Sequence, residues 1–127
     1  MTNRESLGKL YLVDLGPGGL EHLTPAAKEA LQRVDSVVGY GPYVEQVGSL
    51  VQGKNLVTMD LGQELERAAK AVELAYSGHQ VAVVSSGDAG IYGMAGPVFR
   101  VLVDRGWDGE NPPLEVVPGI SAMQSAA

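Results

Sequence analysis

The stretch Val84-Ser85-Ser86-Gly87-Asp88-Ala89-Gly90-Ile91-Tyr92-Gly93-Met94-Ala95-Gly96 is the most informative part of this chain, because an apolar run stops there and gives way to glycine, small hydroxyl side chains and one carboxylate. It continues the run Gln80-Val81-Ala82-Val83-Val84, which is apolar without alternation and so predicts a strand buried on both faces of a parallel sheet. Glycine then recurs at positions 87, 90, 93 and 96, where it lets the backbone turn and approach a ligand. Asp88 follows the carboxyl end of the predicted strand, where open α/β sheets bind ligands. We therefore predict a ligand-binding loop; the alternative is a tight turn that binds nothing.

The length and composition indicate one ordinary globular domain. The 127 residues are 45% hydrophobic and 19% charged, which suits a single core. The absence of cysteine excludes disulfides and a cysteine nucleophile, and it fits a reducing cytoplasm. Residues 1–6 are polar and no long apolar run follows, so we expect neither a signal peptide nor a membrane span. The net charge of −6 argues against nucleic acid. We expect a cytoplasmic protein without a bound metal.

A second glycine-rich loop follows the first predicted strand, residues 9–15. Its sequence is Gly16-Pro17-Gly18-Gly19. A dinucleotide-binding fingerprint needs a further glycine at position 21, which is Glu21, and a P-loop needs Gly-Lys-Ser/Thr at its end, which is absent. Pro17 also lacks the backbone N–H that would bind an anion. We therefore do not expect this loop to bind phosphate.

Strand and helix patterns alternate along the rest of the chain. Thr24 and Pro25 are an N-cap and a first helical residue. The patterns predict strands at 36–40, 55–59, 80–84 and 114–117, and helices at 25–35, 42–50, 63–77 and 94–105. This order predicts an α/β fold with a five-stranded, mainly parallel sheet and helices on both faces.

Three of the predicted helices have an apolar face. Pro97 is expected in the first turn of its helix, where proline is tolerated. The apolar faces contain Ala27, Leu31 and Val34; Leu65, Ala69, Val72 and Tyr76; and Val98, Val101 and Leu102. We expect residues 1–8 to be flexible and 9–127 to form one domain. Because another helix begins at Pro118, we expect this domain to be the first half of a two-domain protein.

Three loops in order carry a family resemblance. We call them the first loop (16–19), the central loop (86–93) and the third loop, Val117-Pro118-Gly119-Ile120-Ser121-Ala122. Together they resemble the tetrapyrrole methylases, S-adenosylmethionine-dependent enzymes of the cobalamin and siroheme pathways. With Gly39-Tyr40 and Tyr43, the central loop is most similar to the C17 branch, which methylates precorrin-3B or cobalt-factor III with ring contraction in cobalamin biosynthesis.

The sequence departs from the common family pattern at two positions. Most relatives carry proline where Ala89 stands, and that departure is typical of the C17 branch. Asp14 stands where relatives usually have glycine, and we leave its role open.

The resemblance implies where the ligands bind. The methyl donor, S-adenosylmethionine, would lie between two domains, and the tetrapyrrole on the N-terminal domain. The implied donor-binding residues are Pro17, Ser86, Gly87, Asp88, Ile91, Ser121 and Ala122. Tyr40, Tyr43 and Tyr92 are candidates for contacting the substrate. The resemblance also implies a C-terminal domain absent from this chain, a homodimer of the full-length enzyme, and no activity for an isolated N-terminal domain.

The identity of a general base stays open. His22 follows the first loop and is a candidate because a base must lie within hydrogen-bond reach of its proton. His79 follows Gly78 at a helix end, and we expect it to be a solvated cap on the far side of the sheet. Two other functions also stay open: methylation of a different ring position by another member of the family, and a non-catalytic doubly wound ligand-binding module.

Overall fold

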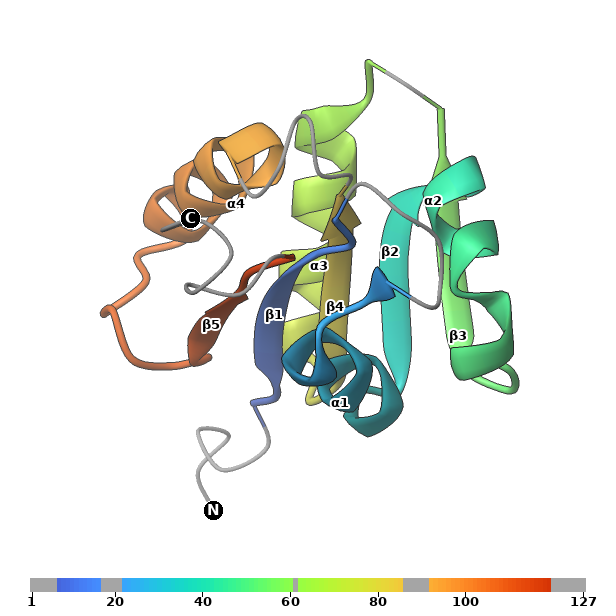
Figure 1. Cartoon of the computed structure of the whole chain (residues 1–127). Helices are drawn as coiled ribbons and strands as arrows, with labels where there is room; N and C mark the ends of the chain where they lie inside the picture. Colours follow the sequence, from blue (N-terminus) through green and yellow to red (C-terminus); the bar gives the residue numbers. More distant parts are fainter. Residues whose placement is uncertain (1–6, 17–21, 61, 86–91, 120–127) are drawn as a thin grey trace, which may run out of the picture.

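The fold is seen in a computed structural model that describes residues 7–16, 22–60, 62–85 and 92–119 (Figure 1). Strands and helices alternate as the sequence predicts. The elements are β1 (Lys9–Asp14), α1 (Pro25–Arg33), β2 (Ser36–Tyr40), α2 (Gly41–Gln46), η3 (Gly48–Leu50), β3 (Asn55–Met59), α3 (Glu64–Tyr76), β4 (Gln80–Ser85), α4 (Tyr92–Asp104) and β5 (Leu114–Val117).

In the described part of the chain the five strands form one sheet in the order β3-β2-β4-β1-β5. Every neighbouring pair is parallel, so the predicted α/β fold is confirmed and the sheet is parallel throughout these residues. β1 lies between β4 and β5, with Asp14 beside Ser85 and Val13 beside both Val84 and Val117. The carboxyl ends of these three strands therefore meet at one edge of the sheet.

Helices cover both faces of the sheet, as predicted (Figure 1). On one face, α1, α2 and η3 bury a cluster that includes Tyr11, Leu31, Val37 and Val84. On the other face, α3 and α4 bury a cluster that includes Leu12, Val72, Val83 and Leu102. The central strands β4 and β1 contribute to both clusters, which explains why their sequences are apolar without alternation.

Local sequence signals explain where α1 begins. Thr24 is its N-cap, and the Thr24 hydroxyl accepts a hydrogen bond from the Ala27 N–H at 3.1 Å. Pro25 takes the first helical position, where a missing N–H donor costs nothing. Ala27, Leu31 and Val34 are buried, so the predicted apolar face of this helix is confirmed.

The predicted face of α3 is wrong in part. Val72 is buried and Tyr76 partly buried, but Leu65 is 45% exposed and Ala69 is exposed too. Ala68, Ala71 and Ala75 are buried in their place. Small side chains let α3 pack closely on the sheet and on α4, and this close packing outweighs the larger apolar area of Leu65.

The start of α4 also differs from the prediction. The helix begins at Tyr92 rather than Met94, so Pro97 lies beyond the first turn, inside the helix. Val98 and Leu102 are fully buried and Val101 partly buried, which confirms the predicted inward face. Among the helices that the structure describes, none has both the length and the apolar character needed to cross a membrane.

Candidate functional site

The candidate site lies at the carboxyl edge of β4, β1 and β5. The first loop leaves β1, the central loop leaves β4 and the third loop leaves β5, and these strands are neighbours in the sheet. The Leu15 N–H extends the β1–β4 pairing by donating to the Ser85 carbonyl at 2.8 Å. The three loops therefore start side by side, as expected for a ligand site in an open parallel sheet.

Asp14 joins the starts of the first and third loops. Its carboxylate Oδ1 accepts a hydrogen bond from the Gly16 N–H at 2.9 Å. Gly119 packs against both the Asp14 carboxylate and the backbone of Gly16. A Cβ at position 119 would lie 2.8 Å from the Asp14 Cγ and 2.6 Å from the Gly16 nitrogen. Gly16 has a φ of +75°, which favours glycine. Only glycine fits both positions without a shift of the backbone.

A second contact ties the same two loops together. The Thr24 hydroxyl, which caps α1, donates a hydrogen bond to the Pro118 carbonyl at 3.2 Å. Thr24 follows the first loop, and Pro118 is the residue of the third loop that comes immediately after β5. From the sequence, Thr24 was predicted only as a helix cap, because the contact with Pro118 depends on the order of the strands.

Arg67 lies beside the start of α4 and was not among the residues predicted from the sequence. The residue is only 6% exposed. Its guanidinium donates to the Asp60 carbonyl at 2.7 Å and lies 3.9 Å from the Met94 sulfur and 3.7 Å from the Glu64 carboxylate. Arg67 thus connects α3 with the first turn of α4, which follows the central loop. Arg67 lies on the buried face of α3 together with Ala68 and Ala71. A pattern of small residues around an arginine is the sequence signal that would have pointed to a buried Arg67.

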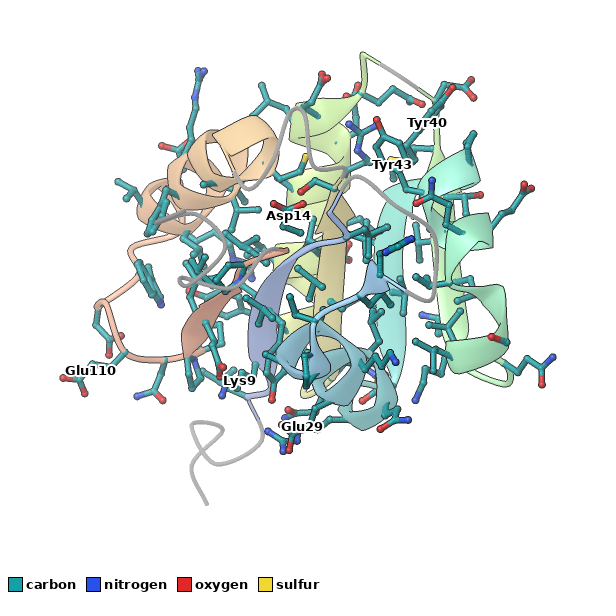
Figure 2. The ribbon with its side chains drawn as sticks, viewed as in Figure 1. Lys9, Asp14, Glu29, Tyr40, Tyr43 and Glu110 are labelled. Carbon is teal, nitrogen blue, oxygen red and sulfur yellow. The ribbon has the colours of Figure 1, made fainter. Side chains whose placement is uncertain are left out.

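Tyr40 and Tyr43 lie at the same edge of the sheet, toward β3 (Figure 2). Their rings meet edge to face with centroids 5.1 Å apart, and both residues are partly buried. Tyr43 also packs against the core beneath α2. The pair therefore has a packing role, and its part-exposed surface is at the edge where the loops begin.

The other predicted site residues lie outside the part of the chain that the structure describes, or have a side chain that is not described. The predicted donor-binding residues lie outside the described residues: Pro17, Ser86, Gly87, Asp88, Ile91, Ser121 and Ala122. Tyr92 begins α4, but its side chain is not described. The structure describes the strand ends from which these residues follow. Among the described residues, no three His, Asp or Glu side chains group closely enough to hold a metal ion.

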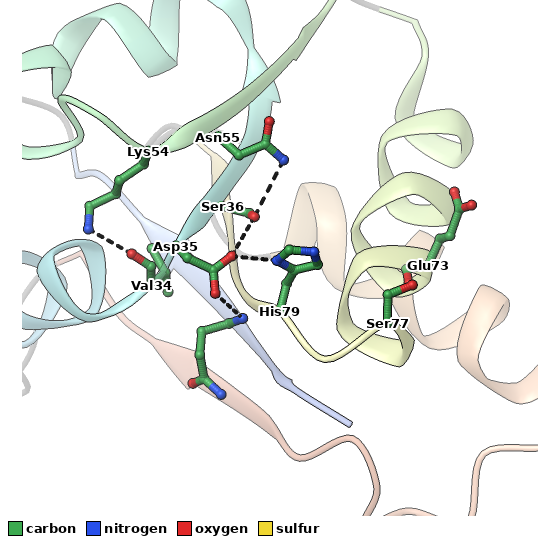
Figure 3. Close-up of polar contacts among 9 residues, drawn as sticks. Val34, Asp35, Ser36, Lys54, Asn55, Glu73, Ser77 and His79 are labelled. Atoms are coloured by element: carbon green, nitrogen blue, oxygen red, sulfur yellow. Dashed lines mark hydrogen bonds and ion pairs between the residues drawn. The ribbon is translucent and has the colours of Figure 1, made fainter. Parts of the chain in front are cut away.

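The two histidines lie in different surroundings. His22 is exposed just after the first loop. His79 precedes β4 at the opposite, amino edge of the sheet, where its backbone N–H donates to the Leu74 carbonyl at the end of α3 and its Nδ1 lies 2.9 Å from the Asp35 carboxylate (Figure 3). The prediction that His79 belongs to a helix end on the far side of the sheet is confirmed.

Asp35 is the centre of the polar network at that amino edge (Figure 3). Its carboxylate accepts hydrogen bonds from the Gln80 N–H at 2.9 Å and the Ser36 hydroxyl at 2.7 Å. Partial burial acts to raise the pKa of Asp35, but the hydrogen bonds from Gln80, Ser36 and His79 outweigh it and lower the pKa below its usual value. This network joins β2 to β4 and is remote from the three loops.

Known proteins that are similar to this chain identify its family. The family described as Tetrapyrrole (Corrin/Porphyrin) Methylases matches residues 9–127. A cobalt-factor III methyltransferase of Priestia megaterium is 47% identical over 94% of this chain, which spans 22% of that protein. A precorrin-3B C(17)-methyltransferase of a Sinorhizobium species is 33% identical over 94% of this chain, which spans 47% of that protein.

Solved structures have the same fold. The methyltransferase CobJ superposes with a TM-score of 0.79 and 38% identity, over 94% of this chain and 49% of that one. A uroporphyrin-III C-methyltransferase of Thermus thermophilus, complexed with S-adenosylhomocysteine, gives 0.66 and 28% identity over 94% of this chain and 48% of that one. The chain thus spans about half the length of these two solved chains. It spans less than half the length of the two curated relatives. Because the family matches residues 9–127 and the solved relatives share the fold, the chain belongs to the tetrapyrrole (corrin/porphyrin) methylases.

Proposed function

We propose that the full-length protein transfers a methyl group from S-adenosylmethionine to C17 of a corrinoid precursor, with ring contraction, in cobalamin biosynthesis. The observation that carries this proposal is the similarity, across 94% of the chain, to a cobalt-factor III methyltransferase and to a precorrin-3B C(17)-methyltransferase. The substrate would be cobalt-factor III or precorrin-3B, the compounds named for these two relatives. Because the chain spans less than half of each relative, we propose that it supplies the N-terminal domain and that a C-terminal domain completes the enzyme.

The donor would bind where the three loops start. In this proposal, Pro17, Ser86, Gly87, Asp88, Ile91, Ser121 and Ala122 contact S-adenosylmethionine. The relative solved with S-adenosylhomocysteine has 28% identity to this chain and supports a donor of this class.

Positioning is the main task of the protein in this chemistry. The donor supplies a methyl group on a positively charged sulfur; the bond from carbon to sulfur breaks as the substrate carbon bonds to the methyl carbon, and the electron pair stays on sulfur. Holding two reactants in line supplies up to about 7–11 kcal/mol in model reactions. The described loop starts suit this task, because the contacts among Asp14, Gly16 and Gly119 fix where the first and third loops leave the sheet.

The tetrapyrrole would lie beside the donor at the carboxyl edge. Tyr40 and Tyr43, at the end of β2 and the start of α2, are proposed to contact it together with Tyr92. Aromatic rings offer flat apolar surface for a macrocycle, and each tyrosine hydroxyl can hydrogen-bond to a polar group at its edge. We further propose that the full-length enzyme is a cytoplasmic homodimer.

A product analysis tests this function. The full-length protein is incubated with methyl-labelled S-adenosylmethionine and either cobalt-factor III or precorrin-3B, and the products are separated and identified by mass spectrometry and NMR. We expect one labelled methyl group at C17 of a ring-contracted product. A label at another ring position would identify a different methylase of the family, and donor binding without any transfer would identify a non-catalytic module.

A further inference from the structure

Asp14 is placed where it touches two of the three loops. It ends β1, the strand between β4 and β5, and its register partner is Ser85 at the end of β4. Its side chain is partly buried, and Oδ1 accepts the Gly16 N–H at 2.9 Å. This hydrogen bond ties the side chain at the end of β1 to the backbone two residues further on, where the first loop begins. The carboxylate therefore fixes the start of the first loop.

The same carboxylate supports the start of the third loop. Gly119 is buried, and a Cβ there would lie 2.8 Å from the Asp14 Cγ and 2.8 Å from its carbonyl oxygen. A Cβ on Gly16 would in turn lie 3.0 Å from the Gly119 carbonyl oxygen. The first and third loops thus meet at close range, with the Asp14 side chain between β1 and the backbone of Gly119.

From this arrangement we propose that Asp14 is a positioning residue: its Oδ1 sets the angle at which the first loop leaves β1 and so holds the first and third loops in the geometry that binds the methyl donor. This role rests on the proposed function. It depends on the acceptor oxygen rather than on the negative charge. Asparagine keeps that oxygen without the charge, whereas alanine removes both, so the two substitutions separate the two explanations.

The test uses the full-length protein and S-adenosylhomocysteine, the methyl-transfer product, as the probe. Calorimetry gives its dissociation constant in the wild type, Asp14→Ala, Asp14→Asn and Asp35→Ala. The last variant removes an equal charge at the amino edge, away from the loops. We expect Asp14→Ala to weaken binding about tenfold, as the loss of one well-placed hydrogen bond does. Asp14→Asn should stay within about twofold of the wild type, as should Asp35→Ala.

Three results would overturn this role. Unchanged affinity in Asp14→Ala, even with a lower melting temperature, would make Asp14 only a structural residue. Equal weakening in Asp14→Asn and Asp14→Ala would assign the effect to the charge. If Asp35→Ala weakens the binding of S-adenosylhomocysteine as much as Asp14→Ala does, the loss of affinity would come from the overall electrostatic field of the protein. If the wild type itself does not bind S-adenosylhomocysteine, the proposed function fails first, and the role of Asp14 with it.

Discussion

Gly16 and Gly119 are in backbone contact although they follow different strands. A Cβ on Gly119 would lie 2.6 Å from the Gly16 nitrogen, and a Cβ on Gly16 would lie 3.0 Å from the Gly119 carbonyl oxygen. Real Cβ atoms do not approach backbone atoms as closely as the first of these distances. The starts of the first and third loops therefore meet without any side chain between these two glycines. In the function that we propose, the donor-binding geometry depends on that contact.

Replacing Gly119 by alanine should separate these two loops. The new methyl group must displace the backbone of Gly16 or Asp14, and such overpacking costs about 1–3 kcal/mol. We expect a lower unfolding midpoint and weaker binding of S-adenosylhomocysteine, measured by thermal unfolding and calorimetry on the full-length protein. Gly48→Ala is the matched control because a Cβ there meets nothing within 4 Å. Equal behaviour of the two variants would refute the contact.

Thr24 should contribute to stability through both of its hydrogen bonds. Thr24→Val keeps the shape of the side chain but removes the hydroxyl that binds the Ala27 N–H and the Pro118 carbonyl. Loss of an N-cap costs about 1 kcal/mol, and we expect at least this much in chemical unfolding. Thr24→Ser keeps the hydroxyl and should remain close to the wild type. An equally large loss in Thr24→Ser would show that the methyl group, not the hydroxyl, matters.

Arg67 should stabilise the junction of α3 and α4. Arg67→Ala removes the charged hydrogen bond to the Asp60 carbonyl and leaves a cavity beside Met94. We expect a loss of about 2 kcal/mol or more in the free energy of unfolding. Arg100→Ala, which changes an exposed residue of α4, should stay within about 0.5 kcal/mol. The account of Arg67 fails if both variants unfold at the same denaturant concentration.

The network around Asp35 predicts a pH dependence of stability. Because the pKa of Asp35 is lower in the folded protein, the ionised carboxylate stabilises the fold at pH values above its unfolded pKa of about 3.9. That contribution is lost as the pH falls through the lower, folded pKa. Urea unfolding between about pH 7 and pH 2 should therefore give wild type and Asp35→Asn stabilities that converge in acid. A constant difference across this range would contradict the assignment. The effect should be small, since the side chain is half exposed.

Local sequence signals predicted most of the fold. The strands at 36–40, 55–59 and 114–117 begin and end as predicted. The face of α3 was wrong because an apolar scale favours Leu65 over alanine, whereas close helix packing favours Ala68, Ala71 and Ala75. The contacts of Asp14 with Gly119 and of Thr24 with Pro118 could not be predicted, because they depend on the strand order β4-β1-β5, which local patterns do not contain.

The place where the donor product binds is the sharpest test of the proposed methyl-donor site. The measurement is a crystal structure of the full-length protein with S-adenosylhomocysteine. We expect the ligand at the carboxyl edge of β4, β1 and β5, next to Gly16 and Gly119, with the Asp14–Gly16 hydrogen bond intact. A ligand at the amino edge near Asp35 and His79, or one bound with Gly16 and Gly119 apart, would contradict the account.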